Sequence, residues 1–434
     1  MRSADVENSE GSRSRSIFFN LGLFQFLTFL RRGVFYTFMI NYLFVLMGTV
    51  TSTATLGTLN MVASAIGQNF FWGKVCDRRK LRTELIIIGE STAGIAYIIV
   101  FFIHRALIDA GNGFASGLAI IFGLSLLEFF WSMSDVGWAA LLTDVTTPDV
   151  RGKIVGILNF IASLGRMIGI VFAGFLYGDG EGFKNGDIFF IVTVLLFIGM
   201  VLMTLTSRRV RTKNTAQKQS TSMEGDRHKG NATWRNERMY KWFLVSLIII
   251  VLGAASINQI FLLFINLPEG LHAMDPEMSL ILSAWTIGGM IASLTSGALA
   301  DRFGRTNILL VGLSLTAITP LFYSLASSVP LMALIYGFNG VAFWTLQTVG
   351  FALAGDIIPE DRRGRLLGRY NTVIALSWGP AGILIGGPFA DIQTNTFGLS
   401  KQAAFANAFY VSSILIALGT LLFVIKVARA KPEK

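Results

Sequence analysis

The sequence predicts an all-α integral membrane protein with twelve transmembrane helices in two six-helix bundles related by an internal repeat. Three observations predict this fold class: an apolar composition, twelve apolar runs of membrane-spanning length, and short phrases that recur in both halves. Of the 434 residues, 53% are hydrophobic and only 14% are charged, with a mean hydropathy of +0.60. This composition is too apolar for a soluble fold of this length.

The predicted spans follow from the length of a bilayer core, which needs about 20 apolar residues per helix. Apolar runs fall at roughly 17–46, 54–75, 84–103, 116–143, 153–177, 187–206, 241–267, 278–300, 307–327, 330–354, 365–390 and 403–425. We therefore expect a cytoplasmic tail (1–16), an N-terminal six-helix bundle (17–206), a basic cytoplasmic linker (207–240), a C-terminal six-helix bundle (241–426) and a second cytoplasmic tail (427–434).

The net charge of +10 is explained by topology rather than by a nucleic-acid partner. Thirty of the 36 Lys and Arg residues fall in loops and tails on one side of the predicted spans, and only Arg105, Lys184 and Lys401 fall on the other. The positive-inside rule then predicts that both termini are cytoplasmic. We expect a multi-pass protein of the plasma (inner) membrane, with the lipid bilayer as its surroundings.

The sequence offers little material for a metal site or a cofactor. Cys76 is the single cysteine, and the three histidines are His104, His228 and His272. Neither a Cys/His zinc site nor a disulfide framework is expected from these residues. The chain also contains no Walker loop, so we expect no cofactor and no ATP-driven cycle.

An internal repeat relates the two halves of the chain. The phrase that begins at Gly73 and contains Asp77 and Arg78 corresponds to the one that begins at Gly297 and contains Asp301 and Arg302. A second set recurs at a constant offset of 212 positions, with Asp144, Arg151, Gly152, Gly156 and Asn159 matching Asp356, Arg363, Gly364, Gly368 and Asn371. Duplicated six-helix units place each phrase in the loop after the second or fourth helix of its half.

The segment from Gly297 to Arg305 resembles the signature loop of the major facilitator superfamily, and the resemblance extends over all twelve spans. The first copy departs from the signature, with Lys80 where Gly is usual and Leu81 where Arg is usual, although Arg82 follows directly. The resemblance implies a secondary carrier that works by alternating access.

The resemblance also implies a cytoplasmic latch, in which Asp77 caps the start of the eleventh helix near Gly364 and Asp301 caps the start of the fifth near Gly152. Alternatively, Asp77 and Arg78 are solvated loop charges. The residues assigned to the latch are Gly73, Asp77, Arg78, Asp144, Arg151, Gly297, Asp301, Arg302, Arg305, Asp356 and Arg363.

Ionisable groups within spans are costly and usually serve the transport pathway. All six that we identify lie in the first half: Arg31 and Arg32 in the first helix, Glu90 in the third, Glu128 and Asp135 in the fourth, and Arg166 in the fifth. We assign proton coupling to Glu128 and Asp135 and substrate binding to the three arginines. The alternative for each charge, favoured for Glu90, is a structural ion pair between packed helices.

The second half offers neutral polar groups at comparable depth. We predict that these bind substrate through hydrogen bonds. The residues assigned are Asn258, Gln259, Asn339, Gln347 and Asn371, together with the neighbouring Trp344 and Trp378.

These observations predict a monomeric secondary active transporter that moves a small organic solute by alternating access and is coupled to protons. The alternative is an organic-anion uniporter or exchanger without proton coupling. A polytopic membrane enzyme is a remote alternative, because no catalytic constellation is recognised at the membrane interface. The identity of the solute and the direction of transport stay open.

Overall fold

The computed structural model describes residues 2–146, 148–214, 236–359 and 363–429. Every element in this part of the chain is helical, which confirms the predicted all-helical membrane fold. Within it, ten helices are long and apolar enough to cross a membrane. Large apolar side chains such as Phe175 and Leu294 are more than 70% exposed on such helices, as is expected where a helix faces lipid.

The helices follow the predicted spans, with breaks in some of them. They are α1 (Arg2–Tyr36), α2 (Met39–Met47), α3 (Val50–Ile66), α4 (Gly73–Arg79), α5 (Thr83–Asp109), α6 (Gly113–Val145), α7 (Pro148–Leu176), α8 (Glu181–Lys184), α9 (Asp187–Asn214), α10 (Glu237–Ser256), α11 (Asn258–Asn266), α12 (Asp275–Phe303), α13 (Arg305–Ile318), α14 (Val329–Ile357), α15 (Arg363–Trp378), α16 (Gly387–Asn395) and α17 (Lys401–Phe423). Short π or 3-10 turns cover Gly67–Trp72, Gly178–Gly180, Thr319–Leu325, Gly382–Gly386 and Val424–Ala428.

The chain divides into two compact units. Unit 1 comprises Met1–Phe38 and Val62–Asp226, and unit 2 comprises Met39–Met61 and Arg227–Lys434. Residues 39–61 thus belong to the first half of the sequence but pack within unit 2, and α3 begins in unit 2 and ends in unit 1. The predicted boundaries of the two bundles stay a prediction.

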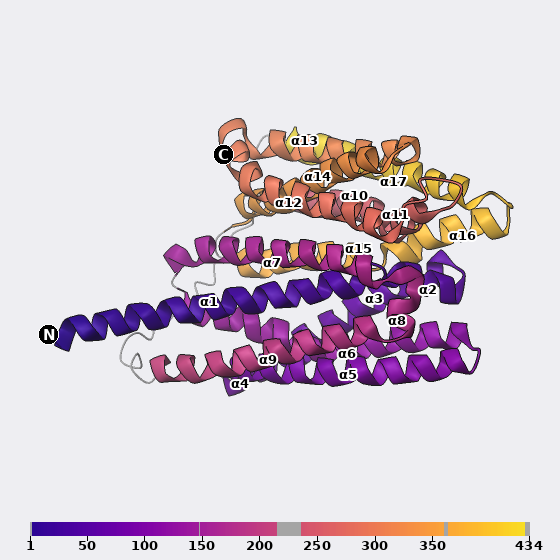
Figure 1. The fold of residues 1–434 in the computed structure, drawn as a ribbon. Coiled ribbons are helices and arrows are strands. Elements are labelled where there is room, and N and C mark those ends of the chain that lie inside the picture. Colours follow the sequence, from indigo (N-terminus) through magenta and orange to yellow (C-terminus); the bar gives the residue numbers. More distant parts are fainter. Residues whose placement is uncertain (1, 147, 215–235, 360–362, 430–434) are drawn as a thin grey trace. The chain divides into compact units, whose positions relative to one another are not determined.

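Unit 1 is a bundle of long helices in which α1 lies along α7, parallel to it, and α5 lies along α6, antiparallel to it (Figure 1). Glycine allows the closest of these approaches, since a Cβ atom added to Gly33 would lie 2.9 Å from Cα of Gly169. Small residues at such crossings let helix backbones pack where no hydrophobic force drives association. At the start of α6, Asn112 accepts a hydrogen bond from the Ala115 amide at 3.0 Å, as an N-cap does.

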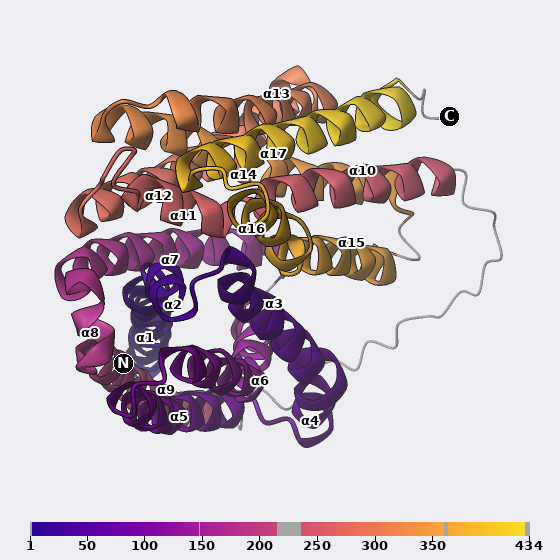
Figure 2. The same cartoon turned by 90° about the vertical axis from the view of Figure 1, so that its right-hand side faces the viewer.

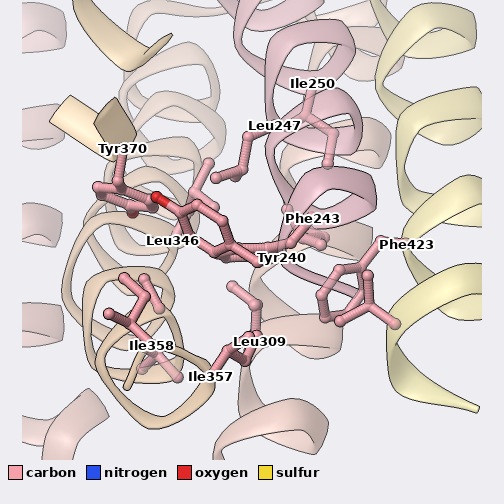
Figure 3. Packing of buried hydrophobic residues seen from close by; sticks show 14 of the residues in the cluster. Tyr240, Phe243, Leu247, Ile250, Leu309, Leu346, Ile357, Ile358, Tyr370 and Phe423 are labelled. Carbon is pink, nitrogen blue, oxygen red and sulfur yellow. The ribbon is translucent and has the colours of Figure 1, made fainter. Parts of the chain in front are cut away.

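In unit 2, α12 lies along α14, and α10 lies along α17 (Figure 2). Figure 3 shows the apolar core between α10, α14, α15 and α17, in which Phe243 stacks on Tyr370 and lies beside Phe423. The hydroxyl of Tyr240 donates a hydrogen bond to the Leu366 carbonyl at 2.6 Å. This core fixes α15, the helix that carries two of the predicted substrate-binding residues.

Candidate functional site

In unit 1, α6 carries both carboxylates assigned to proton coupling. Glu128 and Asp135 are seven residues apart, so they lie on one face of the helix, two turns from each other. The Asp135 side chain is 38% exposed, and its Oδ1 atom lies 3.9 Å from Nη2 of Arg32 on α1. The structure therefore brings together one predicted coupling residue and one predicted substrate-binding arginine.

A short polar chain joins the two carboxylates. The side-chain amide of Gln68 donates to Oδ2 of Asp135 at 3.3 Å and to the Ser64 hydroxyl at 3.1 Å. Ser64 in turn interacts with the Glu128 carboxyl. Polar side chains therefore connect Glu128, through Ser64 and Gln68, to Asp135 and Arg32, all within unit 1.

Trp131 lies between the two carboxylates in sequence and holds both arginines of α1. The guanidinium carbon of Arg31 is 4.4 Å from the Trp131 ring centroid, and that of Arg32 is 4.2 Å away. Cation–π contacts of this kind contribute about 0.5 to 2 kcal/mol, more when desolvated. The indole therefore stabilises both positive charges and offsets part of their mutual repulsion.

Glu90 on α5 fixes the indole. Its Oε1 atom accepts hydrogen bonds from Nε1 of Trp131 at 2.7 Å and from the Ser134 hydroxyl at 2.8 Å. Glu90 is 1% exposed and Trp131 is 2% exposed. Glu90 thus hydrogen-bonds the indole that contacts both arginines, and its expected role as a structural ion-pair partner stays a prediction.

Arg31 and Arg166 differ sharply in their surroundings. Arg31 is 2% exposed, and its Nε and Nη2 atoms have no hydrogen-bond partner among the residues that the structure describes. Its guanidinium lies over the Trp131 ring instead. Arg166 lies on α7, where its side chain is exposed.

In unit 2, a pocket of about 320 Å³ lies beside α14 and α15. Three of its seven lining residues are among those assigned to substrate binding from the sequence: Gln347, Asn371 and Trp378. The other four lining residues are Met61, Phe343, Ile374 and Ala375. The structure thus gathers part of the predicted neutral polar set around one cavity.

Two further residues assigned to the second half lie elsewhere in unit 2. Asn339 accepts from Nε1 of Trp285 at 3.2 Å and donates to the Thr319 hydroxyl at 2.8 Å, so both ends of its amide hold helices together. Trp344 packs against Trp285, with ring centroids 6.2 Å apart. These contacts favour a structural role for both residues.

Asn258 and Gln259 begin α11, where the seventh predicted span breaks. Oε1 of Gln259 is buried without a hydrogen-bond partner in the described chain. A Cβ atom on Gly382 would lie 2.8 Å from this oxygen. Gln259 therefore faces the π turn that interrupts the eleventh span, whereas neither residue lines the pocket.

The two signature loops carry matching ion pairs, each within its own unit. Nε of Arg82 lies 2.9 Å from Oδ2 of Asp144, and Arg305 pairs with Asp356 and, at 3.8 Å, with Asp301. Burial would lower the pKa of Arg82, but its hydrogen bond to Asp144 and the Asp144 charge outweigh burial and raise that pKa. Both pairs anchor a signature loop to the end of the fourth helix of its half.

Other residues assigned to the latch lie on the surface of these loops. Asp77, Arg78, Asp301 and Arg302 are exposed. The side chains of Arg151 and Arg363 lie outside the described part of the structure, and the surroundings of the predicted cap positions, Gly152 and Gly364, are not described either. Gly73 and Gly297 lie on α4 and α12, and the latch itself stays a prediction.

Sequence reasoning missed Trp131, Ser64, Gln68 and Phe343. Trp131 lies three residues after Glu128 and four before Asp135. This helical spacing puts all three on one face and is the signal that predicts its place. Ser64 on α3 and Gln68 on the turn that follows it are also four residues apart, so they lie on one helical face.

Comparison with known proteins identifies the family of this chain. The family model of the Major Facilitator Superfamily matches residues 21–274 and 257–434. The chain belongs to the major facilitator superfamily. As a major facilitator it is a multi-pass membrane transporter that binds a transported solute, and it is not an enzyme.

Among curated major facilitators, the multidrug resistance protein MdtL of Escherichia coli O157:H7 is 25% identical over 138 residues, or 32% of this chain. The match spans only 35% of MdtL. YuxJ of Bacillus subtilis (strain 168), an uncharacterized MFS-type transporter, is 24% identical over 356 residues, covering 81% of this chain and 82% of YuxJ.

Solved major facilitator structures share the fold. The nucleoside transporter NupG superposes with a TM-score of 0.69 at 13% identity, covering 96% of this chain and 100% of NupG. A bacterial homologue of the human lysosomal transporter Spinster, in an inward-facing and unoccupied conformation, gives 0.66 at 13% identity and covers 96% of both chains. At these identities the likeness shows the fold alone.

Proposed function

We propose that this major facilitator is a proton-coupled secondary carrier of a small organic solute, and that Glu128 and Asp135 carry the coupled proton. The observation that supports this most directly is the polar chain from Glu128 through Ser64 and Gln68 to Asp135 and Arg32. Ionisable groups in a span that are linked in this way are typical of proton relays.

The coupling step follows from the partners of Asp135. When Asp135 is ionised, it attracts Arg32, whereas a protonated Asp135 loses most of that attraction. Trp131 remains 4.2 Å from the Arg32 guanidinium, so its ring supplies an alternative partner for the released cation. Protonation of Asp135 thereby frees Arg32 to contact a solute, while the Trp131 ring continues to stabilise its charge.

In this proposal the unit 2 pocket supplies the hydrogen bonds that orient the solute. Alternating access in this fold moves the two bundles around a site near the bilayer midplane. The distribution of basic residues supports cytoplasmic termini in the plasma (inner) membrane. We propose that the carrier works as a monomer.

Reconstitution in liposomes tests the proposal. The purified protein would be given an imposed pH gradient, an internal pH-sensitive dye and a probe panel of tetraphenylphosphonium, benzoate, benzamide and a hexose. The likeness of one stretch to a multidrug resistance protein supports including a lipophilic cation. We expect one class of probe to drive proton flux, and this flux to fall at least about tenfold in Glu128→Gln and Asp135→Asn.

A matched control tests whether the loss of proton flux is specific to Glu128 and Asp135. Glu181→Gln removes an exposed carboxylate of unit 1 that pairs with Lys184 at 3.1 Å and takes no part in the polar chain from Glu128 to Arg32. This variant should transport like the parent protein. Solute movement that ignores both the pH gradient and Glu128→Gln would instead support an organic-anion uniporter or exchanger.

A further inference from the structure

The unit 2 pocket has the dimensions of a site for one small ring system. Its volume of about 320 Å³ is at the low end of the range of roughly 300 to 1,000 Å³ that small-molecule sites occupy. All of its lining residues belong to unit 2. The pocket is open on one side, so a solute or solute moiety of about that size is expected to rest against these side chains.

The lining carries no formal charge. Its seven side chains are two carboxamides, two aromatic rings and three apolar groups. An ion that gives up part of its hydration against such a lining gains no counter-charge in return, which is unfavourable. The pocket therefore selects against both anions and cations.

One wall of the pocket is aromatic. The rings of Phe343 and Trp378 are tilted by 53°, with centroids 5.0 Å apart. Met61 adds a polarisable thioether, and such groups pack well against rings. A planar aromatic ligand gains more here than an aliphatic one of equal volume, because offset and tilted ring pairs add to the area buried.

The two carboxamides supply hydrogen bonds. Gln347 and Asn371 each present one acceptor oxygen and two N–H donors, and neither has a hydrogen-bond partner in the part of the chain that is described. They project from α14 and α15, two different helices. A ligand with a donor and an acceptor side by side, such as an amide or a lactam, satisfies both.

From these features we infer that the solute is a neutral, planar aromatic compound with an adjacent hydrogen-bond donor and acceptor, of the size of an aryl amide or a single heterocyclic base. The inference rests on the proposed function, because it takes the pocket as the place where the solute is oriented. It replaces the organic-anion alternative with a definite chemical class.

Three ligands of one shape and different charge test the class. Benzamide is neutral, benzoate is an anion and benzamidinium is a cation at neutral pH, and all three are planar. Binding to purified protein in detergent would be measured by ligand-observed NMR titration. We expect benzamide to bind at least about tenfold more tightly than either charged analogue.

Variants locate the binding. Gln347→Met and Asn371→Leu keep the side-chain size but remove the amide, and each should weaken benzamide binding about five- to tenfold, as the loss of one hydrogen bond does. Asn407→Leu is the matched control, since Asn407 is a carboxamide of α17 that donates to Gln393 at 2.7 Å and does not line the pocket. Unfolding temperatures would confirm that each variant is folded.

The outcomes separate this inference from proton coupling. Equal or tighter binding of benzoate or benzamidinium, no binding of any of the three, or an unchanged benzamide affinity in folded Gln347→Met and Asn371→Leu would each overturn it. Benzamide binding without proton flux would retain the pocket and reject the coupling. Proton flux driven by other probes, with no benzamide binding, would retain the coupling and reject the assignment of the pocket.

Discussion

Arg82 donates a hydrogen bond to Asp144 across 2.9 Å, and this contact ties the first signature loop to the end of α6. Nη1 of the same guanidinium also donates to the Cys76 carbonyl at 2.9 Å. Arg305 and Asp356 form the equivalent contact in unit 2. Each repeat therefore holds its own signature loop in place.

Loss of this pair should loosen the loop more than it destabilises the protein. The side chains of Arg82 and Asp144 are 25% and 39% exposed, so we expect Asp144→Asn to change the free energy of unfolding by less than about 1 kcal/mol. Hydrogen exchange of the amides in 76–82 should nevertheless become faster. Asp109→Asn, which removes the surface pair with Arg105, is the control and should leave that segment unchanged.

The hydrogen bond between Trp131 and Glu90 gives a prediction about stability. Trp131→Phe keeps a ring for the arginines but removes the indole N–H that donates to the buried Glu90 carboxyl group. Leaving a buried acceptor without its donor costs about 1 to 3 kcal/mol. The free energy of unfolding in detergent should fall by about that amount, which would be measured as a lower thermal unfolding temperature.

Trp138→Phe is the matched control for this variant. Trp138 is an indole of the same helix, one turn after Ser134, and its ring packs on Phe24 with centroids 5.4 Å apart. The substitution therefore changes a second indole of α6 without touching the Glu90 carboxyl group, and it should be tolerated. Equal losses of stability in the two variants would contradict the special role of Trp131.

The sequence predicted the helices well, because apolar runs and basic loops follow directly from the cost of placing polar groups in lipid. It predicted the site less well, because contacts between helices depend on rotation and register. Leu81 occupies the position where the signature loop usually has Arg, yet the neighbouring Arg82 makes the pair with Asp144. Lys80 adopts a left-handed φ of 51° where the second copy has Gly304.

The grouping of residues 39–61 with unit 2 shows the same limit. Nothing in the apolar pattern of the first two spans separates these residues from their own half of the sequence. Their packing is decided by particular contacts, such as the hydrogen bond from the Thr58 hydroxyl to the Gly379 carbonyl at 2.9 Å. Pairings between distant segments of this kind leave no local signal.

Cys76 gives a prediction about pH. Burial raises the pKa of its thiol, although the neighbouring Arg82 charge opposes the shift, and the side chain is only 1% exposed. Because the thiolate is the reactive form, a raised pKa leaves less of it at neutral pH. We expect slow maleimide labelling whose rate rises about tenfold per pH unit between roughly pH 7 and pH 8.5.

An exposed cysteine provides the comparison for that measurement. Thr396→Cys in a Cys76→Ser background puts the only thiol at an exposed position after α16. It should label much faster at neutral pH than the native protein does. Similar rates for the two proteins would mean that Cys76 is accessible and that its environment is not the one described.

The last prediction concerns Asp391, whose carboxylate caps the start of α3. Oδ1 accepts from the Val50 amide and Oδ2 from the Thr51 amide, both at 2.9 Å. A carboxylate at this position satisfies amides that a helix leaves unpaired and complements its dipole. Replacing a cap by alanine costs about 0.5 to 2 kcal/mol, so Asp391→Ala should speed hydrogen exchange at the first amides of α3 about fivefold.

The connectivity makes this cap more than a local detail. α3 begins in unit 2 and continues into unit 1, so Asp391 holds the end of α3 that belongs to unit 2. Glu277→Ala is a matched control, because it removes the carboxylate that accepts from the Met274 amide at the start of α12 at 2.9 Å. Faster exchange should then appear at α12 and not at α3. If Asp391→Ala leaves exchange at Val50 and Thr51 unchanged, the carboxylate does not hold the start of α3.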